Sequence, residues 1–285
     1  MDLSVVVITY DSRAHITACL RSLGRARGAL AMEVVVVDNA SPDGTADFIR
    51  RELPGTWVID SGANLGYSKA ANMGIRATTG EFVLVLNPDS EIGEGALAAL
   101  IAWMRSHPRT GIAGPRLVGP DGVPEHSGRT FPGPQTILFN RYSLLTRLFP
   151  GNRWSKRYLL ADWDRSSSRS VDWLSGSCMC VRRAAIAQAG EMDEGYFMFN
   201  EDVDWCHAMK DAGWSVDYVA DAAVMHRIGA SHGRTSERVV RERHLGMIRY
   251  FRKYHSRNPL LVALVSMAVH ARMHLMLFLN SRRPA

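Results

Sequence analysis

The chain has 285 residues, enough for one large domain or two small ones, and 46% of them are hydrophobic while 22% are charged. These fractions are typical of a globular protein and argue against a disordered chain. The net charge of +6 favours anionic partners such as nucleotides, diphosphates or acidic lipid headgroups.

The first half of the chain alternates apolar runs with helical patterns. Residues Leu3–Thr9 form a nearly continuous run rich in Val and Ile, which predicts a buried parallel strand. We expect further strands at 34–37, 56–60, Phe82–Leu86 and 112–118. We expect helices at 12–25 with Ser12 as cap, at Thr45–Glu52 and at 94–106, and one more that follows the lead-in Asn64-Leu65-Gly66-Tyr67 and runs through Ala77. This alternation predicts an α/β fold with a doubly wound, mostly parallel sheet and helices on both faces.

The strand at Phe82–Leu86 ends on Asn87-Pro88-Asp89-Ser90. Pro88 cannot donate a ladder hydrogen bond, so the strand must stop there and place Asp89 at the carboxyl edge of the sheet. Ligands of open α/β sheets bind outside that edge, where a carboxylate can hold a hard cation. An ordinary turn has the same composition, and the residues alone leave both interpretations open.

The middle of the chain is less regular. Residues 130–170 form a long insertion rich in Arg, Ser, Pro and aromatic residues, and such insertions are more often functional or mobile than structural. A strand is expected at 171–181 with Ser175-Gly176-Ser177 inside it, a helix at 201–212, and two short strands at 215–219 and 222–226. Acids in the first turn of that helix favour its dipole, which by itself accounts for Glu201 and Asp202.

The C-terminal part, residues 231–285, predicts a basic helix at Glu237–Tyr254 and, after Asn258-Pro259, an apolar segment at 260–279. His270, Arg272 and His274 interrupt that segment, which falls short of the ~20 clean apolar residues that cross a bilayer. It fits a helix lying in a membrane interface beside a basic helix, or a helix packed on the domain.

The cysteines and the N-terminus indicate a cytosolic protein. No second Cys pair completes a zinc site with Cys178 and Cys180, which would share one face of a strand. We expect them, together with Cys19 and Cys206, to be reduced thiols in the core. The N-terminus has no basic region ahead of its first apolar run, so no signal peptide is expected.

Five motifs then occur in a specific order. They are Thr9-Tyr10 after the first strand, Asp38-Asn39-Ala40-Ser41 after the second, Asn64-Leu65-Gly66, Asn87-Pro88-Asp89, and Glu201-Asp202-Val203-Asp204-Trp205. Over residues 3–230 the chain resembles family 2 of the inverting glycosyltransferases, which have the GT-A fold, and most closely their bacterial rhamnosyltransferase-like members. The resemblance implies one domain at 1–230, with a nucleotide-sugar-binding half at 1–120 and an acceptor-binding half at 121–230.

The resemblance also implies roles for the donor-binding residues. Thr9, Tyr10 and Asp38 would hold the base and ribose, and a carboxylate can accept from a pyrimidine N–H. Asn64 and Gly66 would line the nucleotide site, and Lys69 would approach a phosphate, although a solvated helix lysine explains Lys69 nearly as well. The nucleotide would belong to dTDP-rhamnose or to a UDP-sugar.

The metal and the catalytic base follow from the same resemblance. The family's Asp-x-Asp motif has Asn87 at its first position here, a form found in the rhamnosyltransferase-like branch, and Asp89 at its last. Asp89 would share Mg²⁺ or Mn²⁺ with the donor diphosphate, and His226 would join them as in some relatives. Asp202 matches the general base, and Gly176, Glu201 and Trp205 would lie beside the acceptor.

The resemblance implies that the acceptor is a glycan, possibly lipid-linked. The basic and apolar C-terminal helices suggest that the protein is cytoplasmic and binds an anionic membrane surface, the inner face of a bacterial cell membrane. A nucleotidyltransferase or a nicotinamide dehydrogenase would need a glycine-rich loop after the first strand, and Thr9-Tyr10-Asp11-Ser12 is not one. A non-catalytic glycan- or membrane-binding scaffold remains an alternative, although Asp202 is present. Nothing beyond net charge suggests nucleic acid, and the oligomeric state is left open.

Overall fold

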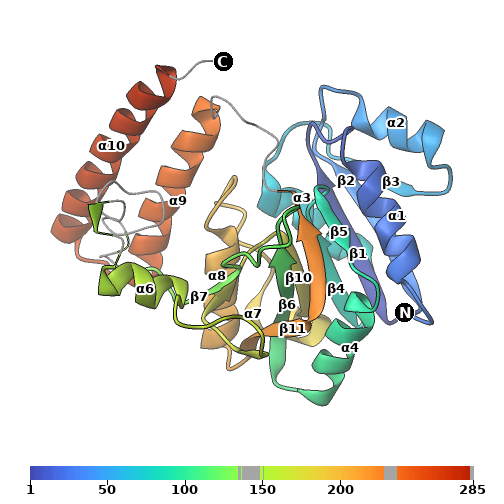
Figure 1. Cartoon of the computed structure of the whole chain (residues 1–285). Coiled ribbons are helices and arrows are strands. Elements are labelled where there is room, and N and C mark those ends of the chain that lie inside the picture. The colour runs from blue at the N-terminus through green and yellow to red at the C-terminus, as the bar shows by residue number, and fades with distance from the viewer. Residues whose placement is uncertain (134–135, 137–147, 150, 228–235, 283–285) are drawn as a thin grey trace.

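The computed structural model describes residues 1–133, 136, 148–149, 151–227 and 236–282 (Figure 1). Its strands are β1 (Leu3–Thr9), β2 (Met32–Asp38), β3 (Trp57–Asp60), β4 (Phe82–Leu86), β5 (Ser90–Ile92), β6 (Thr110–Val118), β7 (Gly128–Arg129), β8 (Arg169–Ser170), β9 (Trp173–Leu174), β10 (Cys178–Arg182) and β11 (Ser215–His226). Its helices are α1 (Ile16–Ala26), α2 (Thr45–Glu52), α3 (Tyr67–Ala77), α4 (Ala96–Ser106), α6 (Arg153–Leu159), α7 (Arg183–Ala189), α8 (Glu201–Asp211), α9 (Glu237–Tyr254) and α10 (Pro259–Ser281).

One large sheet runs through the molecule in the order β3-β2-β1-β4-β10-β6-β11-β5, with β8 paired to β11. Strands β3, β2, β1 and β4 are mutually parallel, as are β6 and β11, while β10 runs antiparallel between β4 and β6. Strands β7 and β9 form a separate two-stranded ribbon. The expected α/β fold with a mostly parallel sheet is confirmed, and its parallel strands bring their carboxyl ends to one edge.

Alternate residues of each central strand enter two separate cores. Val6 of β1 and Val83 of β4 belong to a cluster that also contains residues of α3, α7 and α8. Val5 and Leu84, the next or preceding positions, belong to a second cluster with residues of α1, α2 and α4. Helices therefore cover both faces of the sheet, which explains why these strands are apolar at nearly every position.

Several element boundaries are as expected, among them those of β1, α2, β4 and α9. Helix α1 is different, because it begins at Ile16 with His15 as N-cap and no side-chain capping bond. The Ser12 hydroxyl instead donates to the Tyr10 carbonyl oxygen at 3.0 Å, so the expected cap at Ser12 is wrong. The cysteines behave as predicted: all four are buried and free.

The expected strand at 171–181 is two strands, β9 and β10, separated by residues 175–177. Conversely, the two strands expected at 215–226 are one long strand, β11, whose register against β6 shifts between Val219 and Ala223. The basic insertion contains the short helix α6, which its irregular composition did not predict. The arginines of that insertion at 141 and 147 lie outside the described residues.

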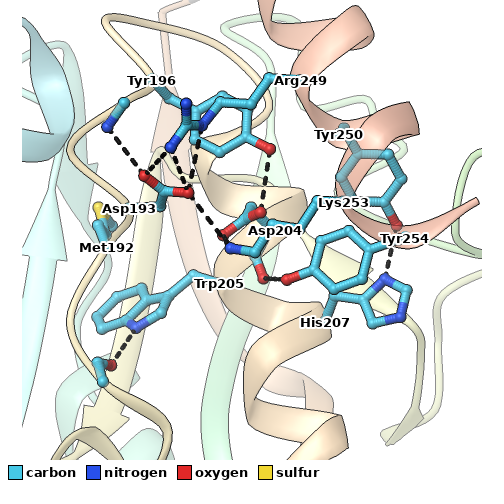
Figure 2. A network of polar contacts seen from close by, with 12 residues as sticks. Met192, Asp193, Tyr196, Asp204, Trp205, His207, Arg249, Tyr250, Lys253 and Tyr254 are labelled. Carbon is cyan, nitrogen blue, oxygen red and sulfur yellow. Dashed lines mark hydrogen bonds and ion pairs between the residues drawn. The ribbon is translucent and has the colours of Figure 1, made fainter. Parts of the chain in front are cut away.

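Helices α9 and α10 pack side by side at one end of the molecule (Figure 1). Figure 2 shows how α9 is attached to the sheet domain through two carboxylates. Arg249 forms a bidentate pair with Asp193, and Lys253 donates to Asp204 at 2.8 Å. Asp204 is buried and also accepts from the Tyr196 hydroxyl at 3.0 Å. A buried carboxylate with these partners fixes α9 against α8, the helix that begins at Glu201.

Candidate active site

The carboxyl ends of β1 and β2 meet in a polar pair. Thr9 lies opposite Asp38 in the parallel register, and its hydroxyl donates to Asp38 Oδ1 at 2.8 Å. Asp38 also accepts from the Ser41 hydroxyl at 2.6 Å and the Ser41 amide at 3.0 Å. Both Thr9 and Asp38 are buried, so these contacts shape the loop that follows β2, whereas Tyr10 is 48% exposed at the rim and is open to a ligand.

A second polar group joins this loop to the start of α3. Asn39 donates to Asn64 Oδ1 and to the Gly66 carbonyl oxygen, both at 3.1 Å, and accepts from the Leu65 amide at 2.9 Å. Gly66 has φ +88°, and a Cβ there would lie 2.5 Å from the Phe197 carbonyl oxygen, so only glycine fits. Lys69 is exposed on the first turn of α3. Asn39 belongs to a motif noted in the sequence, yet its organising contacts were not anticipated.

Asp89 and His226 do come together. His226 Nε2 lies 3.5 Å from Asp89 Oδ1, and Nδ1 lies 3.2 Å from Glu125 Oε1. Burial disfavours the imidazolium, but the two carboxylates outweigh it and raise the pKa of His226 to about 9. Glu125 was not predicted, because only the fold brings it to a histidine 101 residues away.

These residues fit a divalent cation only in part. Among the described residues, no group of three or more His, Cys, Asp and Glu side chains is arranged to hold a metal. Asp89 Oδ1 is nevertheless buried and accepts no hydrogen bond, although His226 Nε2 lies 3.5 Å away, and such an oxygen can take a cation as a further ligand. Asn87 lies at the end of β4, where its backbone amide donates to the Ser177 carbonyl oxygen at 2.9 Å. One carboxylate and one imidazole match a site that diphosphate oxygens complete.

Asp202 lies in the first turn of α8, facing the turn between β9 and β10. Its Oδ2 accepts from the Gly176 amide at 3.0 Å, and its Oδ1 accepts from the Val203 amide at 2.8 Å. Burial raises the pKa of Asp202, and these two backbone amides oppose the rise. Phe199 and Asn200, just before α8, both have positive φ, a conformation that costs free energy and sets the direction of this turn.

The neighbours of Asp202 have different environments. Glu201 is 7% exposed, its Oε2 has no hydrogen-bond partner, and burial together with the Asp202 charge raises its pKa well above the ordinary range. Trp205 is 1% exposed and donates from Nε1 to the Gly190 carbonyl oxygen at 2.9 Å. Trp205 is therefore part of the core, and contact with an acceptor would require the helix to move. Asp204 faces Lys253 and so serves another role than Asp202.

Two further residues approach Asp202 without having been predicted. The Tyr67 hydroxyl donates to the Gly176 carbonyl oxygen at 2.9 Å, which connects the start of α3 to the turn that faces Asp202. Arg129, on β7, lies over the Trp173 ring at 4.7 Å, and its charge opposes the rise in the pKa of Asp202. The site thus has polar groups at the ends of β1 and β2, a buried histidine between the carboxylates of Asp89 and Glu125, and the half-buried carboxylate of Asp202 held against the turn at Gly176.

Comparison with known proteins shows what this arrangement is similar to. The model of Glycosyl transferase family 2 matches residues 4–163. An N-acetylglucosaminyl-diphospho-decaprenol L-rhamnosyltransferase of Mycobacterium tuberculosis is 37% identical over 244 residues, which cover 81% of this chain and 78% of that protein. The low-salt glycan biosynthesis hexosyltransferase Agl10 of Haloferax volcanii is 32% identical, over 72% of this chain and 61% of that protein.

Solved structures support the fold. A structure of GalNAc-T7 with UDP, GalNAc and Mn²⁺ matches with a TM-score of 0.62 at 14% identity, covering 88% of this chain and 47% of that one. The mannosyltransferase PcManGT of Pyrobaculum calidifontis, with GDP-Man and Mn²⁺, matches with a TM-score of 0.61 at 18% identity, covering 98% and 72%. The expected GT-A architecture is confirmed.

Proposed function

The chain belongs to glycosyl transferase family 2, in its rhamnosyltransferase-like branch, and from that premise we propose that it transfers L-rhamnose from dTDP-rhamnose to a lipid-linked N-acetylglucosaminyl acceptor in cell-wall synthesis. The relative of 37% identity, whose name contains this acceptor and this sugar, supports the substrates. The observation that carries the chemistry is the position of Asp202, half-buried in the first turn of α8, where its Oδ2 accepts from the Gly176 amide in the turn between β9 and β10.

Asp202 is proposed as the general base of an inverting transfer. The acceptor oxygen attacks the anomeric carbon, the bond from that carbon to the diphosphate oxygen breaks, and the hydroxyl proton passes to Asp202. Burial raises the pKa of Asp202 toward the working pH, which makes the carboxylate a stronger base, while the Gly176 and Val203 amides keep it ionised and oriented. Glu201, which favours its neutral form, leaves the negative charge to Asp202.

The donor nucleotide is proposed to lie on the rim formed by the ends of β1 and β2. Tyr10 offers an exposed ring, and Asp38 is held in place by Thr9 and Ser41 with capacity for one more donor. Asn64 and Gly66 set the backbone at the start of α3, where exposed Lys69 lies within the same helical turn and can approach a phosphate. The sequence and structure are equally compatible with a UDP-sugar, which is the alternative donor.

Asp89 and His226 are the proposed ligands of Mg²⁺ or Mn²⁺, with Asn87 beside the donor. Two matched structures contain Mn²⁺, which supports a divalent cation. When bound, the cation would offset the charge that develops on the departing nucleoside diphosphate. In the protein itself, Glu125 holds Nδ1 of His226 and thereby directs Nε2 toward Asp89.

We propose that α10 attaches the enzyme to the cytoplasmic face of an anionic membrane. In the part of the chain that the structure describes, α10 is the one helix long and apolar enough to cross a bilayer by length and composition, and 11% of its apolar 18-residue stretch is buried. The sequence predicts that His270, Arg272 and His274 interrupt this segment too much for it to cross a bilayer, and by composition that prediction is wrong. Its attachment to α9, which carries Arg249 and Lys253, favours a position along the interface, since crossing would pull that charged helix into lipid.

A transfer assay tests the proposed function. The full chain is incubated with Mg²⁺ or Mn²⁺, an N-acetylglucosaminyl-diphospho-lipid and a panel of dTDP-, UDP- and GDP-sugars, and both nucleoside diphosphate release and product are measured. We expect product only with dTDP-rhamnose. Product from a UDP-sugar instead would establish the alternative donor. Acceptor binding without turnover of any donor would support the non-catalytic scaffold.

A further inference from the structure

A cavity of about 840 Å³ lies outside the site described so far. Its walls come from the segment after β7, from α6 and from the residue before β9, and they include Phe131, Arg153, Arg157, Tyr158 and Asp172. This cavity lies in the basic insertion, whose function the sequence left unassigned. It is large enough for a small polar ligand with part of an attached chain.

The cavity has an excess of positive charge. Arg153 and Arg157 are one helical turn apart on α6, and among the described residues neither side chain is within ion-pair distance of a carboxylate. The carboxylate of Asp172 already accepts from Lys210 Nζ at 2.8 Å and from the Phe131 amide at 2.9 Å. Two guanidinium groups are therefore available to an anion, and guanidinium pairs suit phosphate oxygens.

Aromatic rings form the other walls. Phe131 stacks on His207 with ring centroids 4.2 Å apart, and His207 stacks on Tyr254 of α9 at 3.7 Å. The guanidinium of Arg153 lies 5.0 Å from the Trp154 ring, which is 39% exposed. An anion-binding face next to exposed aromatic surface suits a ligand that is charged at one point and apolar beyond it.

The cavity is connected to both the active site and α10. Residues 125–130 run from Glu125, beside His226, to Thr130 in the cavity wall. Asp172 in the wall is four residues from Gly176, which contacts Asp202, so the separation is at most ~14 Å of extended chain. On the other side, His255 Nε2 lies 2.8 Å from the Pro132 carbonyl oxygen, just before α10 begins.

We propose that this cavity binds the diphosphate of the lipid-linked acceptor, with Arg153 and Arg157 pairing with its oxygens and the aromatic walls contacting the start of the lipid. The inference rests on the proposed function. It assigns to the cavity the acceptor's diphosphate and not the donor's, because Asp89 and His226 lie at the far end of the 125–130 segment. The acceptor sugar would then extend toward Asp202, and the lipid toward α10.

Charge-removing variants test this assignment. Arg153→Gln and Arg157→Gln are compared with Lys156→Gln, which removes the same charge from an exposed position of α6 that does not line the cavity. We expect each arginine variant to raise the KM for a lipid-diphosphate acceptor about tenfold with kcat and donor KM little changed, and the lysine variant to match the wild type. With an N-acetylglucosaminide on an uncharged alkyl chain, all four proteins should have similar KM values.

Three results would overturn the proposal: arginine variants that match the lysine variant, an equal loss with the uncharged acceptor, or a rise in donor KM instead of acceptor KM. Binding to phosphatidylcholine vesicles with and without a polyprenyl diphosphate separates this inference from the proposed function. If the wild type transfers no sugar but binds the diphosphate vesicles, and the double variant Arg153→Gln/Arg157→Gln does not, the proposed function fails while the cavity assignment stands. Equal vesicle binding by both proteins would overturn the assignment.

Discussion

The sheet around β1 and β4 and the C-terminal helix α10 are both strongly apolar. The strands bury their apolar side chains, whereas α10 exposes many of its own. Every residue of β4 is buried, and polar groups begin only where the strand ends. In α10, Leu260, Leu264, Met267 and Phe278 are each at least half exposed, whereas Val269 and Met273 are buried. Apolar surface in the sheet thus stabilises the fold, and on the outer face of α10 it is left available for binding.

Charged side chains also differ between the sheet edge and the C-terminal helices. At the edge of the sheet, Asp202 and His226 are buried or half-buried, and their pKa values are shifted by their surroundings. On α9, Arg249 and Lys253 are partly exposed and pair with carboxylates of the domain, which fixes the helix pair to the sheet (Figure 2). Groups with shifted pKa values indicate the catalytic site, and exposed apolar groups indicate the surface that binds a partner. Four predictions test this comparison.

The largest effect is expected at the sheet edge. Asp202→Asn keeps the shape of the side chain but removes the proposed base, so turnover should fall ~10²- to 10⁴-fold with donor binding little changed. Steady-state rates at saturating donor and acceptor, with donor affinity measured by calorimetry, check this prediction. Near-normal turnover of the variant would remove Asp202 from the mechanism.

The same substitution in both regions should have opposite consequences. Leu84→Ala leaves a cavity in the core and should cost about 2–5 kcal/mol of unfolding free energy. Leu264→Ala, at a position 52% exposed, should cost less than about 0.5 kcal/mol but weaken binding to anionic vesicles by about tenfold. Urea unfolding and vesicle co-sedimentation measure the two quantities.

The Leu264 result decides how α10 is used. A stability loss comparable to that of Leu84→Ala, without any change in vesicle binding, would show that the outer face of α10 is covered by protein. The proposed membrane attachment would then be withdrawn. Release of the wild type from vesicles in high salt would report the contribution of the basic residues.

An intermediate effect is expected at Glu125, which contacts His226, one of the two proposed ligands of the cation. Glu125→Gln should raise the concentration of Mg²⁺ or Mn²⁺ needed for half-maximal activity by ~10- to 100-fold, because Glu125 orients His226 and supports its basicity. Asp89→Ala should raise that metal concentration further than Glu125→Gln does. Excess chelator should inactivate the wild type. Full activity of the wild type in chelator would contradict the assignment of a metal.

The smallest effect is expected at Glu201. Because burial raises its pKa above the ordinary value of 4.5, the folded state retains a proton that the unfolded state releases, and stability falls as pH rises from that value. Glu201→Gln removes this penalty and should raise the unfolding free energy by about 1 kcal/mol at pH 8, with a smaller difference at pH 4. Melting curves at the two pH values measure it, and a variant that is less stable than the wild type at pH 8 would contradict it.

The sequence by itself determined the buried parallel strands β1 and β4 and the residues at their ends. Buried parallel strands must be apolar on both faces, so β1 and β4 were recognisable residue by residue, and the polar groups that follow them had to lie at the edge. The basic character of α9 and the apolar character of α10 were also local properties. The motifs around Asp38, Asp89 and Asp202 were sufficient to indicate the family.

Only the tertiary structure decided which of these residues meet. Glu125 reaches His226, and the Gly176 amide reaches Asp202, through contacts between distant segments that leave no local pattern. The family resemblance predicts that Trp205 contacts the acceptor beside Asp202, yet the helix places its side chain in the core. The outward direction of the apolar face of α10 depended on which side packs against α9, because a helix that is apolar nearly all round does not specify its buried side.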